Sequence, residues 1–181
     1  MKRWQIWLLN NKELERDFNE YLEEGLIRKI APVPRLVKIH INKAFHNIDF
    51  ASFTLKNQEK INKRIQSETY FDWVIIISYY AMYHSALALL YKLGYKTATH
   101  LTTICVLCSE CLGKSLEKQD IETISRIFEL SENEIREIAR AKERREKASY
   151  SGSISFEKHL AELTLKDGRD FVNKVADILE V

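Results

Sequence analysis

Apolar residues recur at helical spacing along most of this chain. After Pro34 they follow alternating steps of four and three residues, which predicts a helix about five turns long. The seam of that helix consists of Val37, Ile41, Ala44, Ile48, Ala51 and Leu55. The closing seam of the chain consists of Leu160, Thr164, Gly168, Phe171, Val175 and Ile178. No segment shows a convincing strand alternation, so the pattern predicts an all-α fold.

A central segment from about Thr69 to Leu93 is apolar nearly all round the helical wheel, and Gly94 follows it as a stop signal. Such a helix is expected to be buried on several sides. We expect its seam to consist of Trp73, Ile77, Tyr80, His84, Leu87 and Tyr91, with Ile76, Tyr83 and Leu90 widening the face. The polar tips within this helix need hydrogen-bond partners if they are buried.

Short breaks separate the remaining helical segments. Lys12 to Glu23 is amphipathic and precedes Gly25, Thr99 to Leu112 forms a further helix, and the Ser-x-x-Glu box at Ser131 opens a long charged helix to about Tyr150. Short loops between long helices favour antiparallel neighbours. The sequence therefore predicts an up-and-down antiparallel helical bundle over residues 31–181, with an N-terminal helical extension over residues 1–30.

Composition limits the function classes. The 181 residues are enough for one core, and 28 Lys and Arg against 26 Asp and Glu give a net charge of only +2, so nucleic-acid binding needs a local basic patch. The longest uninterrupted apolar runs are too short to span a bilayer, and no signal peptide is evident. We expect a cytoplasmic protein without a membrane segment, in which Trp4 and Trp7 are core or interface residues.

Cys105, Cys108 and Cys111 have a spacing that suggests a metal or iron–sulfur site. However, they fall within one continuous helical stretch, where steps of three residues spread them around the helix. No second cluster of Cys and His accompanies them. We expect free thiols that serve as small core residues, and we expect no metal or other cofactor.

The charged helix before Tyr150 carries a basic stripe. Arg136, Arg140 and Arg144 follow one another at four-residue intervals on its exposed face. Arg145 lies on the apolar seam instead, seven residues after Ile138. An inward Arg requires a partner, unless its stem follows the core while its head reaches water, and both readings remain open.

His84 has two interpretations. It is either a hydrogen-bonded core residue with Tyr80 as its partner, or a residue of a central cleft that faces Arg145. The other histidines expected to be solvated or exposed are His40, His46 and His100.

Three stretches carry a family resemblance. They are Tyr79 to Leu90, Gly94 to Thr97 with His100 after it, and Arg144 to Ser151, which is similar to an Arg-x-x-Ala-Asp-Tyr signature. Together they resemble one subfamily of the HEPN domains, a helical family of nucleotide-binding and often RNA-associated proteins. The likeness extends from about Gly25 to the C-terminal end, and it implies the same helical bundle.

The better-studied HEPN members that this chain resembles are RNA-cleaving or RNA-binding dimers. In their signature, an Arg that holds phosphate precedes by four to six residues a His that acts as acid or base. In this chain Tyr150 stands five residues after Arg145, and a Tyr is a poor general base at neutral pH. Candidate catalytic residues are Arg145, Glu146, Tyr150 and His84. Candidate phosphate, nucleic-acid or partner-binding residues are Arg136, Arg140, Arg144, Arg145, Lys147 and Tyr80.

Three functions follow from the resemblance. The first is a nucleotide- or RNA-binding partner of a small nucleotidyltransferase in a toxin–antitoxin-like module, with a degenerate catalytic motif. The second is a metal-independent ribonuclease with a nonstandard site, and the third is a catalytically silent helical scaffold. Whether the chain is an enzyme stays open. We expect a homodimer, in which the small residues Ala81, Ser85 and Ala88 allow close helix approach.

Overall fold

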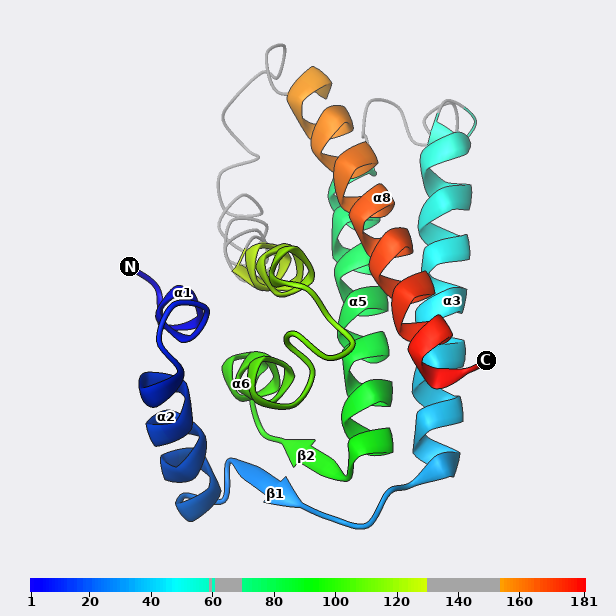
Figure 1. The fold of residues 1–181 in the computed structure, drawn as a ribbon. Coiled ribbons are helices and arrows are strands. Elements are labelled where there is room, and N and C mark those ends of the chain that lie inside the picture. The colour runs from blue at the N-terminus through cyan, green and yellow to red at the C-terminus, as the bar shows by residue number, and fades with distance from the viewer. Residues whose placement is uncertain (59, 61–69, 130–153) are drawn as a thin grey trace.

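The computed structural model describes the whole chain except residues 59, 61–69 and 130–153, and it is predominantly helical (Figure 1). The elements are α1 (Arg3–Trp7), α2 (Asn11–Glu23), β1 (Ile27–Lys29), α3 (Pro34–Lys56), α5 (Phe71–Leu93), β2 (Tyr95–Thr97), α6 (His100–Glu110) and α8 (Ile154–Leu179). Residues 118–129 form a further helix after α6. The prediction of an all-α helical bundle is confirmed.

The three long helices, α3, α5 and α8, lie together on one side of the molecule (Figure 1). The N–H of Val33, just before α3, donates to the carbonyl of Tyr91 near the end of α5, which makes these two helices antiparallel. Helix α8 runs in the same direction as α5, because Gly168 lies against Ser78 while Lys92 reaches the carbonyl of Ile178. Within the described residues, α8 is thus antiparallel to α3 and parallel to α5.

Two predicted seams are confirmed by burial. In α3 the buried positions are Ile41, Ala44, Ile48, Ala51 and Thr54. In α8, Gly168 brings the helix backbone close to α5, and a side chain there would lie 3.4 Å from both the Ser78 carbonyl oxygen and Ile48 Cδ1.

The predicted seam of α5 is wrong for its central residues, although Ile76 and Leu90 at its margin are buried. Trp73 and Tyr80 are exposed, with 52% and 42% of their surface accessible, while His84, Leu87 and Tyr91 are only partly buried. The fully buried positions lie on the other sides of the helix and include Val74, Ala81, Met82, Ser85, Ala86, Ala88, Leu89 and Leu90. Because nearly every position of α5 is apolar, its sequence periodicity cannot select the face that its neighbours cover.

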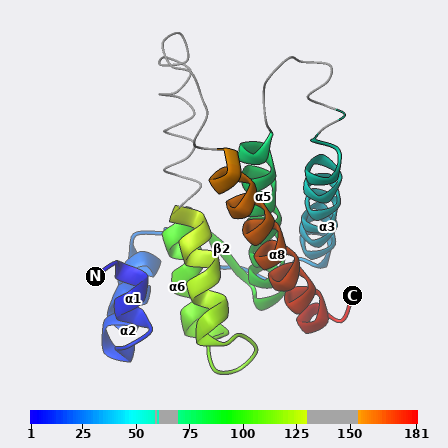
Figure 2. The same ribbon diagram turned by 90° about the horizontal axis from the view of Figure 1, so that it is seen from above.

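The N-terminal segment packs against α6 rather than against α3. Seen from above, α1 and α2 form one layer, followed by α6, then α5 with α8, and then α3 (Figure 2). Trp4 and Trp7 are buried as expected, and the indole N–H of Trp7 donates to Asp17 Oδ2 at 2.7 Å. Burial raises the pKa of Asp17, but hydrogen bonds from Arg3 and Trp7 outweigh it and hold that pKa below its usual value.

A small antiparallel sheet, which the sequence pattern did not predict, fastens this segment to the bundle. It pairs Ile27 with Thr97 and Lys29 with Tyr95. Strands of three residues are too short to show a two-residue alternation. One contiguous apolar core includes residues from both sides of the predicted boundary at residue 30, and the boundary itself stays a prediction.

The three cysteines are buried free thiols, which confirms their prediction as small core residues. Burial, followed by the neighbouring thiol of Cys111, raises the pKa of Cys108 to about 12. Burial also raises the pKa of Cys111, to about 11. These thiols therefore stay protonated near neutral pH.

Among the described residues, only α5 is long and apolar enough to cross a membrane by length and composition. The expectation of no membrane segment rested on uninterrupted apolar runs, which do not represent the hydropathy of the helix as a whole. Of its most apolar window, 67% is buried inside the protein, and core helices of soluble proteins meet the same criterion. The finding is weak evidence, and cellular location stays a prediction.

Candidate functional site: the open face of the central helix

Among the described residues, the neighbours of helix α5 cover one of its faces only in part. We define the α5 aromatic face as Trp73, Tyr80, His84 and Tyr91, which recur at steps of seven and four residues. Helix α3 borders it through His40, and the helix of residues 118–129 covers the side of α5 that carries Tyr79 and Tyr83. Two of its rings, Trp73 and Tyr80, are exposed on an otherwise mostly buried helix, which makes this face a candidate binding surface.

Two histidines meet at the border of this face. His40 Nδ1 lies 3.0 Å from His84 Nδ1, and the ring of Tyr91 stacks on His40 with its centroid 5.3 Å away. Burial, then the neighbouring His40 and Lys43, lowers the pKa of His84 to about 4, and burial and Lys43 also lower the pKa of His40. Both rings are therefore neutral at pH 7.

Neutral rings at this separation share one proton. One Nδ1–H donates and the other Nδ1 accepts, so the donating ring keeps a lone pair on Nε2 and the accepting ring keeps an N–H there. The pair thus offers one weak base and one hydrogen-bond donor. The expected Tyr80 partner of His84 is replaced by His40, and the expectation that His40 is solvated is wrong, since α3 packs it against α5.

His100 is also not the exposed residue that was expected. Its Nε2 lies 2.7 Å from the hydroxyl of Tyr79, and its ring contacts Phe128 and Tyr83. Tyr79 is only 3% exposed, so this bond gives its buried hydroxyl a partner. The cluster fastens residues 118–129 and the start of α6 to α5, and its role is explained by packing.

Of the candidate site residues, the structure describes His84 and Tyr80, and both belong to the α5 aromatic face. The others lie outside the described residues: Arg136, Arg140, Arg144, Arg145, Glu146, Lys147 and Tyr150. The predicted meeting of His84 with Arg145 therefore stays a prediction. Among the described residues, no group of three or more His, Cys, Asp and Glu side chains could hold a metal ion.

The sequence reading missed His40 as a site residue. It directly precedes Ile41 of the α3 seam, and it is 44 positions from its partner, so helical periodicity alone could not connect the two. A usable signal is the seven-residue interval between His84 and Tyr91, which places two ring side chains on one side of α5. Such an interval predicts a shared face but not the residue of the neighbouring helix that meets it.

Comparison with known protein families found no family model that matches the chain, and no curated protein matches it either.

Proposed function

We propose that this chain is a HEPN-type protein that binds RNA or nucleotides, as the partner of a minimal nucleotidyltransferase in a toxin–antitoxin-like module. The helical bundle and the residue resemblance support the proposal. The observation that carries it is the α5 aromatic face, where Trp73 and Tyr80 are exposed on the same side of the helix as His84, which contacts His40.

This face suits unpaired bases. A base stacks on an exposed aromatic ring whatever its identity, and each such contact is worth about 1–3 kcal/mol. The free Nε2 positions of His40 and His84 offer a donor and an acceptor to a base edge or a phosphate. In the proposal, Arg145 and the basic stripe of Arg136, Arg140 and Arg144 neutralise the phosphates.

The proposal includes binding with little or no hydrolysis. Tyr150 stands where the resembled family has its catalytic His, and its hydroxyl donates a hydrogen bond to a phosphate oxygen but is a poor base. His84 is a weak substitute, because burial and the neighbouring His40 and Lys43 lower its pKa to about 4 and its Nδ1 is engaged by His40. Proton transfer at neutral pH is therefore inefficient both at Tyr150 and at His84.

The test measures binding of a labelled single-stranded oligoadenylate at low and at moderate salt, with gel analysis of the same RNA for cleavage. We expect salt-sensitive binding without turnover, and Arg145→Ala should weaken it more than Arg136→Ala. If the RNA does not bind at low salt and no nucleotidyltransferase partner co-purifies, the proposal is wrong and the silent scaffold is favoured.

A second candidate, a ribonuclease with a nonstandard site, is favoured by the His40–His84 pair, because acid–base cleavage of RNA uses one base and one donor. Degradation of RNA with multiple turnovers that His84→Gln abolishes would establish it. Loss of activity in Tyr150→Phe alone would place the chemistry at the family motif instead.

The proposed assembly is a cytoplasmic homodimer that binds a small nucleotidyltransferase. Such a partner would be encoded beside this gene. Co-expression with that neighbour and purification through a tag on one chain tests the pairing directly.

A further inference from the structure

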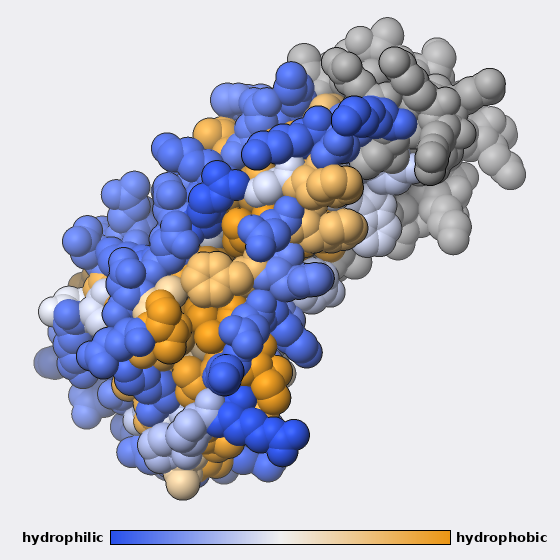
Figure 3. Space-filling view, turned by 90° about the vertical axis from the view of Figure 1, so that its right-hand side faces the viewer, coloured by the Kyte–Doolittle hydropathy of each residue, from blue (hydrophilic) through white to orange (hydrophobic). Residues whose placement is uncertain are grey.

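A second candidate site lies away from the α5 aromatic face, on the side where α3 is exposed (Figure 3). It is an apolar pocket of about 570 Å³ between the first turns of α3 and the end of α8. Its apolar lining consists of Pro32, Pro34, Val37, Ile41, Phe45 and Val181. The lining comes from the start of α3, from Lys92 near the end of α5 and from Val181 after α8.

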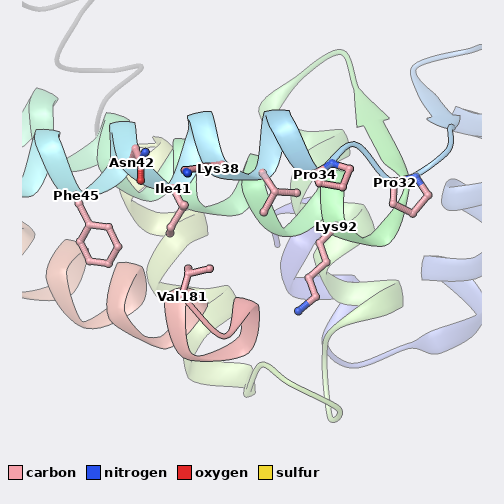
Figure 4. A pocket seen from close by; sticks show the side chains of 9 residues that line it. Pro32, Pro34, Lys38, Ile41, Asn42, Phe45, Lys92 and Val181 are labelled. Carbon is pink, nitrogen blue, oxygen red and sulfur yellow. The ribbon is translucent and has the colours of Figure 1, made fainter.

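The lining follows one stripe of α3. Ile41 and Val181 point toward each other across the pocket, with Phe45 at one end and the two prolines at the other (Figure 4). Pro34 and Phe45 are about 16 Å apart along the helix at 1.5 Å per residue. The pocket is therefore long and narrow, which suits an extended hydrocarbon chain.

The polar residues of the lining are Lys38, Lys92 and Asn42, and no acidic side chain belongs to it. Lys92 Nζ donates to the carbonyl of Ile178 at 3.0 Å. Within the described part of the chain, neither lysine forms an ion pair with a carboxylate. Lys38 and Lys92 are the cationic residues of an otherwise apolar lining, which complements a ligand that has an aliphatic body and a single anionic head.

Size decides between a small ligand and a macromolecule. Pockets for small ligands have volumes of about 300–1,000 Å³, which includes this one. A stable protein interface engages about 20–30 residues on each side, whereas nine residues line this pocket. The observations therefore favour a small amphiphile over a partner protein.

We propose that this pocket binds a free medium-chain fatty acid, with its hydrocarbon along the stripe of α3 and its carboxylate beside Lys38 and Lys92. A twelve-carbon chain is about 14 Å long when extended, because each C–C bond of about 1.5 Å advances the zigzag by about 1.3 Å. That length fits the distance between Pro34 and Phe45. This inference does not depend on the proposed function at α5.

The experiment is calorimetric titration of the full chain with dodecanoate below its micelle concentration, with dodecanol as the uncharged comparison. We expect saturable binding at one site, about tenfold weaker for dodecanol and for the double variant Lys38→Gln, Lys92→Gln. The matched control, Lys56→Gln with Lys166→Gln, makes the same charge change outside the pocket and should stay within about twofold of wild type.

Val37→Trp fills the pocket and should abolish binding, with thermal unfolding confirming that this variant folds. Should it fail to fold, the comparison of the two lysine double variants still decides. No binding of dodecanoate, binding without saturation, or equal binding by both lysine double variants would overturn the proposal.

Discussion

His40 of α3 and His84 of α5 are neutral rings that share one proton, with their Nδ1 atoms 3.0 Å apart. The pair is fixed by packing: Tyr91 stacks on His40, and burial contributes most to lowering both pKa values. At this scale the sequence identified His84 and Tyr80 as site candidates by residue type. It could not identify His40, because the contact depends on how two helices are aligned.

A pH-dependent stability follows from His84. Its folded pKa of about 4 lies below the ordinary value of about 6.5, so the unfolded chain binds the proton more readily. The contribution of neutral His84 to the free energy of unfolding is fully present above about pH 6.5 and is lost as the pH falls toward 4. Because solvent screens the half-buried ring, we expect the free energy of unfolding lost in this way to be about 1–2 kcal/mol.

Urea unfolding at pH 7 and pH 4.5 measures this contribution. His84→Gln should reduce the stability lost between the two pH values, whereas the control His46→Gln, at an exposed ring on the same helix as His40, should lose as much as wild type. Because Asp17 also has a lowered pKa, the difference between variants is the relevant quantity. Equal acid sensitivity in His84→Gln and wild type would contradict the account.

At the scale of elements, predictability depended on amphipathicity. In α3 and α8, apolar residues recur along one face and polar residues occupy the opposite face. Burial confirmed the predicted seams of both helices. Helix α5 is apolar on every side, so the side chains predicted to be innermost, such as Trp73 and Tyr80, became its open face. The β1–β2 pairing was missed because three-residue strands have no readable pattern.

The contact between α5 and α8 predicts opposite effects of two substitutions at Gly168. In Gly168→Ala the new Cβ reaches ordinary contact distance, 3.4 Å, from Ser78 and Ile48, and helix propensity gains about 1 kcal/mol, so stability should rise by 0–1 kcal/mol. In Gly168→Leu the larger side chain separates the helices, at a cost of about 2–3 kcal/mol. Thermal unfolding compares them, and equal melting temperatures would show that the close approach is unimportant.

At the scale of the whole molecule, the homodimer remains a prediction. The residues expected to form its interface have to be revised. Ala81, Ser85 and Ala88 are fully buried within one chain, so they are not free to meet a second copy. The exposed apolar surface lies elsewhere, on the α5 aromatic face and on the outer side of α3.

Sedimentation at micromolar concentration should give twice the chain mass of 21.3 kDa. Ala81→Leu should destabilise the fold through overpacking by about 1–3 kcal/mol rather than only separate the subunits. A single-chain mass for the wild-type protein would exclude the homodimer under these conditions.

The most direct test of the central claim, that the α5 aromatic face binds RNA, compares two pairs of exposed rings. Fluorescence anisotropy with labelled single-stranded oligoadenylate is measured for the double variant Trp73→Ala, Tyr80→Ala, and for Phe50→Ala, Phe53→Ala, whose rings are 52% and 59% exposed on α3. We predict that the first weakens binding about tenfold or more, because it removes two stacking rings, and that the second stays within about twofold of wild type. Equal affinities of the two double variants would contradict the claim.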